Sequence, residues 1–193
     1  MIPLNLAGVL KTWSRNLPVG IPIARVPEVL NGQSTSSESV SNPSTMVLIA
    51  SWTPLSLTTA AAQTLTRSSH ALIAHAGKAY IFGGELKPRI PVDGTLHTVD
   101  LSSGQHNSIQ IADSTEAPAP RVGTALAKLG DALYLWGGRG GKEMKPLSGD
   151  LWKFELGRKE GKWEKLAIKG DQPEDRSYHV LTAVHPVSVF TIL

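Results

Sequence analysis

Cysteine is absent from the 193-residue chain. Without thiols the protein cannot form a disulfide scaffold, a zinc–thiolate site or a cysteine nucleophile. Long apolar runs are also missing. The longest candidate, Met46–Ala50, is far shorter than the roughly 18 residues that indicate a membrane-spanning helix. We therefore expect no membrane association through a spanning segment.

Charged residues are scarce, at 18% of the chain, and the formal net charge is only +3. The basic residues are scattered and most alternate with acids, whereas a nucleic-acid surface needs them clustered on one face. We expect no nucleic-acid partner. The 18 glycines and 13 prolines favour short strands joined by tight turns, because neither residue suits a helix interior. Composition therefore predicts an all-β protein.

Residues 1–45 differ in composition from residues 46–193. The stretch 33–45 is rich in Ser and Thr and has no apolar periodicity, so we expect the whole segment to be disordered. Three basic residues precede its first acid, Glu28, a bias typical of a mitochondrial presequence, although four prolines would interrupt the amphipathic helix. The alternative is a biological start at Met46, with 1–45 an extension or a mis-annotated exon. We expect a cytoplasmic protein, and the sequence leaves the presequence open.

Three landmarks recur along residues 46–193: an arginine, an aromatic residue that ends an apolar run, and a glycine pair. They are Arg67, Phe82 and Gly83-Gly84 in the first copy, and Arg121, Trp136 and Gly137-Gly138 in the second, 54 residues later. A third copy begins at Arg176 and reaches Phe190, 54 residues after Trp136. His70 and His179 also share one place in the repeat, which favours packing over catalysis. A period of this length indicates a repeat architecture.

Each copy has the pattern of four short strands. Continuous apolar residues before the glycine pair predict a strand buried on both faces, and alternation after it predicts a half-buried strand. The predicted strands are 71–75, 79–82, 95–100, 122–128, 132–136, 150–155 and 163–166, with a lone strand at 52–55 before them.

The succession R-S-x-H, L-Y-φ-aromatic-G-G, D-L-W-x-φ and W-x-x-L resembles the kelch repeat. This resemblance implies an all-β fold, a partial kelch β-propeller of four-stranded blades. We expect blades at about 67–114 and 121–167 and a partial third blade at 176–193. It implies that the glycines let neighbouring blades approach and that the three repeat arginines bond carbonyls between blades. The related galactose oxidase chemistry needs a cysteine cross-linked to a tyrosine, which this chain lacks.

Two blades are fewer than the roughly four to eight that close a propeller. The third copy also ends at Val189–Leu193 without its glycine pair. We therefore expect a truncated, alternatively spliced or mis-annotated product of a gene for a full propeller. Its exposed blade edges would favour poor solubility and association.

A closer resemblance is to the nitrile-specifier and thiocyanate-forming kelch proteins, which use ferrous iron. It is carried by Arg67–His70, Phe82–Glu85, Pro91–Asp93, Gly137–Arg139 and Arg176–His179. The resemblance implies that Arg139 helps to hold an anionic ligand. Glu85 holds the equivalent position one repeat earlier, so the two are candidate ligand-binding residues or a salt bridge across the channel. Alternatively, Arg139 pairs with Glu143 or Asp150, or is solvated.

The iron motif of that family, E-x-x-x-D-x-x-x-H, is absent here. Arg89, Asp93 and His97 match its spacing, but arginine cannot ligate iron. We interpret Asp93 as a turn residue and His97 as an outward-facing strand residue. We expect no metal, cofactor or catalytic residue in this chain, with Fe²⁺ restricted to a full-length specifier-type relative.

Two functions stay open. The first is a non-catalytic binding module with a protein partner, which the missing metal ligands favour. The second is a specifier-type protein that directs iron-dependent nitrile formation from glucosinolate aglycones. An iron motif in a downstream blade would distinguish them.

Overall fold

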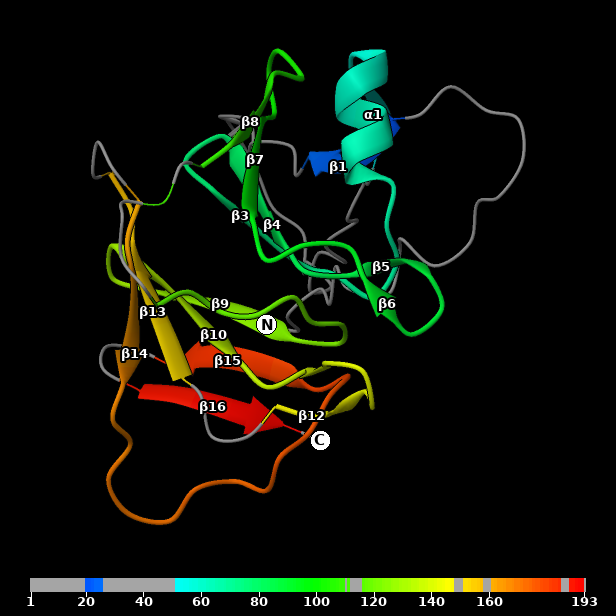
Figure 1. Ribbon diagram of the computed structural model, residues 1–193. Coiled ribbons are helices and arrows are strands. Elements are labelled where there is room, and N and C mark those ends of the chain that lie inside the picture. Colours follow the sequence, from blue (N-terminus) through cyan, green and yellow to red (C-terminus); the bar gives the residue numbers. More distant parts are fainter. Residues whose placement is uncertain are drawn as a thin grey trace, which may run out of the picture.

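The computed structural model describes residues 20–25, 51–109, 111, 116–147, 151–157, 161–184 and 188–192. These residues form antiparallel strands and one short helix. Two four-stranded sheets follow each other along the chain, with a two-stranded sheet after them (Figure 1). The all-β prediction of a partial propeller is therefore confirmed. No helix in the described ranges has the length and apolar content of a membrane span.

The first sheet contains β3 (Ala71–His75), β4 (Lys78–Phe82), β7 (Leu96–Asp100) and β8 (His106–Ser108), in chain order. Four of the five residues of β4 are buried, because this strand lies inside the sheet and is covered on both faces. This is the environment that its continuous apolar run predicted.

The second sheet repeats the first with β9 (Ala125–Leu129), β10 (Ala132–Trp136), β13 (Leu151–Glu155) and β14 (Trp163–Leu166). Burial alternates along β13, as expected for a strand with one covered face. The predicted strand at 122–128 begins later, at Ala125, because the residues before it form the boundary with the neighbouring sheets. The four-stranded plan of both copies is confirmed.

The third sheet is the hairpin of β15 (Val180–Val184) and β16 (Ser188–Ile192). Strand β15 lies against β9, so the third copy sits beside the second (Figure 1). The hairpin occupies the position expected for the first two strands of a third copy.

The register of the third hairpin corrects one sequence prediction. Trp136 pairs with Ala125 in the second sheet, and the residue that pairs with the equivalent Val180 is Ile192 rather than Phe190. The connection between β15 and β16 is one residue longer than that between β9 and β10, and this shifts the register. The repeat spacing places the missing glycine pair at Thr191 and Ile192. Both positions belong to β16, which continues through Ile192.

Strand β2 (Ser51–Ser56) precedes the first sheet and pairs antiparallel with β1 (Gly20–Arg25). Six residues of the segment predicted as disordered therefore form a strand, and the rest of residues 1–45 lies outside the described part. Between β2 and β3 lies a helix that was not predicted, α1 (Thr59–Leu65). Its N-cap, Thr58, accepts a hydrogen bond at 3.2 Å from the backbone N–H of Ala61.

The lone strand predicted at 52–55 lies within β2 and packs against the first sheet. Leu55 of β2 lies in an apolar cluster with Ala79, Ile81 and Val99 on one face of the first sheet. Ile109, 54 residues later, packs against the core that involves the second sheet. The two aliphatic side chains therefore occupy equivalent places beside successive sheets.

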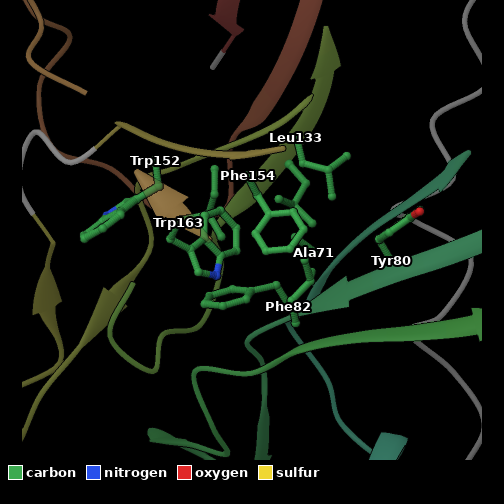
Figure 2. Close-up of a cluster of buried hydrophobic side chains, with 10 residues drawn as sticks. Ala71, Tyr80, Phe82, Leu133, Trp152, Phe154 and Trp163 are labelled. Carbon is green, nitrogen blue, oxygen red and sulfur yellow. The ribbon is translucent and has the colours of Figure 1, made fainter. Parts of the chain in front are cut away.

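The main core lies between the first and second sheets (Figure 2). Trp163 of β14 meets Phe82 of β4 with ring centroids 5.6 Å apart and planes at 69°. The same indole lies 5.1 Å from Phe154 of β13. Aromatic pairs at these spacings are favourable beyond their buried area, so the two sheets are held face to face by side chains from both copies.

Each four-stranded sheet carries a small hairpin after its glycine pair. In the first sheet this is β5 (Glu85–Lys87) with β6 (Ile90–Pro91), and in the second β11 (Arg139–Gly140) with β12 (Lys145–Pro146). Both hairpins lie toward the right of the view in Figure 1. We call this end of the sheets the glycine-pair end.

Candidate binding site

The first glycine of each pair lies against the neighbouring unit. Gly83 and Gly137 have φ angles of +70° and +67°, in the left-handed region that favours glycine. A Cβ on Gly83 would lie 2.5 Å from the carbonyl oxygen of Arg121, and one on Gly137 would lie 2.7 Å from that of Arg176. A side chain at either glycine would therefore meet the backbone of the next unit.

The second glycine of each pair forms the hydrogen bond that crosses this boundary. The backbone N–H of Gly84 donates to the carbonyl of Arg121, and that of Gly138 to the carbonyl of Arg176, both at 2.9 Å. The two bonds have the same geometry in successive copies, so they act as a fixed link between neighbouring sheets.

The guanidinium groups of the first two repeat arginines bond within their own units. Arg67 Nη1 donates to the carbonyl of Gly83 and Arg121 Nη1 to that of Gly137, each at 3.1 Å. These two side-chain bonds hold each arginine against the glycine pair of its own unit. The backbone carbonyl of the arginine makes the link between units, because the second glycine of the preceding pair donates to it.

The third arginine and its histidine pack on the second sheet. Arg176 lies over the ring of Trp136 at 6.0 Å, and the His179 ring meets the same indole edge-on at 4.9 Å. Burial, followed by the nearby arginine charge, lowers the pKa of His179, and burial beside Arg67 does the same to the pKa of His70. Both histidines thus have the surroundings of packed, neutral side chains.

A row of left-handed residues runs along the glycine-pair end, and sequence reasoning missed it. Ser69, Gly123 and Tyr178 have φ angles of 57°, 63° and 59°. The N–H of Gly123 donates to the carbonyl of Ser69 at 2.8 Å, and the N–H of Tyr178 donates to the carbonyl of Gly123 at 2.7 Å. Each lies two residues after a repeat arginine, and this shared offset was the available signal.

Glu85 organises its own hairpin. Its carboxylate accepts hydrogen bonds from the hydroxyl of Ser69 at 3.4 Å and from the backbone N–H of Arg89 at 2.6 Å. Within the described residues Glu85 forms no ion pair, so the salt bridge with Arg139 is not formed. One carboxylate oxygen therefore closes the hairpin turn, and the other accepts from the segment before β3.

Arg139 occupies the equivalent position in the second sheet but has a different environment. Its Nε donates to the hydroxyl of Ser177 at 2.8 Å, in the next unit. Glu143, one of its expected partners, pairs with Lys145 instead, and Asp150 lies outside the described residues. In the part of the chain that the structure describes, no ion pair involves this half-buried guanidinium.

The prediction that His97 faces outward is wrong, because only 3% of the residue is exposed. Its Nε2 lies 3.3 Å from Asp93 Oδ2 and its Nδ1 lies 3.1 Å from His106 Nε2. Arg67 Nη2 donates to the same Asp93 oxygen at 2.9 Å. Asp93 also accepts from the N–H of Thr95 at 3.0 Å, so its predicted turn role is confirmed. These hydrogen bonds hold the buried His97 ring in place.

This cluster does not fit iron. Burial raises the pKa of Asp93, but hydrogen bonds from His97 and Arg67 outweigh burial and hold that pKa well below its usual range. A carboxylate held in this way by a guanidinium has its oxygens engaged already. The residue at the glutamate position, Arg89, is an exposed cation. Among the described residues no group of three or more metal-binding side chains occurs.

A protein-family model for the KLHDC2/KLHL20/DRC7 kelch-repeats domain matches residues 32–191. The match covers most of the chain and both four-stranded sheets. This chain belongs to the kelch-repeat family. The sequence prediction of kelch repeats is therefore confirmed, and the glycine-pair contacts described above are contacts between kelch blades.

Two curated relatives share part of this kelch chain. An N-(sulfonatooxy)prop-2-enimidothioate sulfolyase of Thlaspi arvense is 33% identical over 119 residues, which cover 61% of this chain and 32% of that protein. A leucine-zipper-like transcriptional regulator 1 homolog of Drosophila melanogaster is 32% identical over 90 residues, which cover 47% of this chain and 9% of that protein. The chain thus spans a third or less of the length of either relative.

Proposed function

We propose that this kelch chain is a protein-binding module whose glycine-pair end receives an acidic segment of its partner. The observation that supports the proposal is the state of Arg139. Ser177 fixes its Nε, while no carboxylate among the described residues neutralises its charge. An oriented guanidinium with terminal nitrogens available is a forked donor suited to a carboxylate.

Tyr178 adds a second feature to this surface. Its ring lies over Gly123, with 59% of the residue exposed, and its φ of 59° places a bulky residue in the left-handed region. Such a conformation costs on the order of 1–2 kcal/mol, and residues strained in this way are concentrated at binding sites. Exposed tyrosine beside arginine is also a common composition at protein interfaces.

A small anionic ligand is the second candidate, and one observation favours it. The Thlaspi arvense relative is named for a sulfonatooxy compound, and a sulfate group would accept from Arg139 in the same forked manner as a carboxylate.

The test uses a phage library of random 16-residue peptides, panned against the full chain. Affinities of the enriched peptides are then measured by fluorescence anisotropy. We expect acidic peptides, and we expect R139A to weaken their binding about tenfold or more, since a hydrogen bond to a charged group contributes roughly 1.5–3 kcal/mol.

Two comparisons complete the test. R139K keeps the charge but loses the fork, and should recover only part of the affinity. K142A, in the same hairpin, should bind as wild type does. If R139A binds every peptide as tightly as wild type, the proposal is refuted. If no peptide binds, but calorimetry shows that inorganic sulfate binds in an Arg139-dependent manner, the small-anion candidate replaces it.

A further inference from the structure

The small hairpins of the two complete blades have equivalent backbone geometry but differ in the chemistry of their exposed side chains. Ser68 bridges to Glu85 in the first blade as Val122 bridges to Arg139 in the second. Arg89 also has a left-handed φ of 65°, matched in the second hairpin by Met144 with 53°. One fold therefore carries two different tips, and the difference lies in the side chains.

The first tip is apolar and exposed. Leu86, Ile90 and Val92 are 63%, 58% and 41% exposed, and they are three of the six exposed large apolar side chains among the described residues. In the second hairpin Met144 is buried, and an exposed lysine, Lys145, stands one residue later. The apolar tip is thus specific to the first blade, and exposed apolar clusters of this kind mark interaction surfaces.

The apolar tip is held rigidly. Ser68 and Glu85 exchange two backbone hydrogen bonds, both at 2.8 Å, and the N–H of Val92 donates to the carbonyl of Gly84 at 2.9 Å. The carboxylate of Glu85 accepts from the N–H of Arg89 and closes the turn. A surface fixed in this way loses little conformational entropy when a partner binds.

We propose that the β5–β6 hairpin packs Leu86 and Ile90 against apolar residues of the same partner segment, which carries Asp or Glu side chains beside them. This inference rests on the proposed function and adds a second contact to it. Lys87 and Arg89 flank the apolar residues, are exposed, and form no ion pair within the described part of the chain. Their charge favours acidic groups on the partner.

The same charges disfavour two other binding partners for the hairpin, a second copy of this chain and a membrane surface. In a symmetric contact with a second copy, Lys87 and Arg89 would meet identical cations across the interface. Binding to an anionic bilayer through basic residues usually needs a cluster of about four to eight Lys or Arg. The hairpin supplies only Lys87 and Arg89 and has no aromatic residue at its tip.

The test uses the peptides enriched from the same library and the full chain in three forms. L86S/I90S removes the apolar tip; because both positions are exposed, the variant should melt at the wild-type temperature. K145S alters the equivalent strand of the second hairpin and is the matched control. We expect some peptides that combine apolar and acidic residues to lose at least about tenfold in affinity to L86S/I90S and to bind K145S as they bind wild type.

A charge exchange provides the second arm. K87E/R89E should weaken the same peptides about tenfold or more, and replacing their acids by lysine should restore binding to that variant. If every peptide binds L86S/I90S as tightly as wild type, the hairpin inference is overturned. If R139A still weakens the binding of these peptides, the proposed function stands. If no peptide is enriched, both fail. Leu86-dependent pelleting with phosphatidylserine vesicles, or Leu86-dependent dimers in sedimentation, overturns the inference in favour of those binding partners.

Discussion

Replacing Gly83 with alanine should disrupt the contact between the first two blades. The new Cβ would lie 2.5 Å from the carbonyl oxygen of Arg121, which is backbone and cannot rotate away. The chain itself offers a matched control in Gly77, whose φ of +72° is nearly the same but whose built Cβ meets nothing within 4 Å. Both substitutions place alanine in a left-handed backbone conformation, but only the one at Gly83 brings a Cβ against the neighbouring blade.

The magnitudes follow from this comparison. A left-handed alanine costs about 1–2 kcal/mol, and this is the whole expected effect of G77A. G83A adds the loss of the hydrogen bond from Gly84 N–H to Arg121, a net contribution of about 0.5–1.5 kcal/mol, together with imperfect packing of the displaced blade. We therefore expect G83A to lower the free energy of unfolding by about 2–4 kcal/mol.

Urea denaturation followed by tryptophan fluorescence measures both variants, because Trp163 is buried between these blades. The midpoint should fall at unchanged slope if only stability changes. Equal destabilisation by G83A and G77A would refute the reasoning, since it would show that the neighbouring blade contributes nothing to the requirement for glycine at position 83.

Two further predictions concern stability. W163A should lower the free energy of unfolding by about 3–5 kcal/mol in urea denaturation, whereas W52A, at a half-exposed position, should change it by less than about 0.5 kcal/mol; similar losses would contradict the assigned core. Burial lowers the pKa values of His70, His106 and His179 from 6.5, so the unfolded chain binds protons first as pH falls. Their contribution to stability is complete above pH 6.5 and is lost as pH falls through the lower folded values. Melting temperatures at pH 7.5 and pH 5 check this, and equal values would count against it.

Most of the fold could be predicted from the sequence because the signals are local and repeated. Apolar runs before the glycine pairs gave the strand positions of β4 and β10, and the spacing gave the number of sheets. The helix α1 was missed, since its short Ala-rich segment has no apolar periodicity long enough to indicate a helix. The register of β16 was also missed, because the extra residue in its hairpin leaves no mark in the landmarks themselves.

The candidate site was predicted less completely than the fold. Arg139 and Glu85 hold equivalent sequence positions, yet Arg139 donates to the next blade and Glu85 closes a turn. The residues that decide this, Ser177 and the N–H of Arg89, are contributed by the next blade and by the local turn. His97 was misplaced for a similar reason, since the network that buries it includes an arginine 30 residues earlier.

The sequence by itself determined that the chain is a kelch repeat, because a glycine with a left-handed φ must return wherever one blade meets the next, and that requirement is written in the spacing. Only the tertiary structure decided which atoms make the contact and which side chains are left for a partner. Hydrogen bonds between blades join residues more than 30 positions apart, and the availability of a charge depends on every group that folds around it.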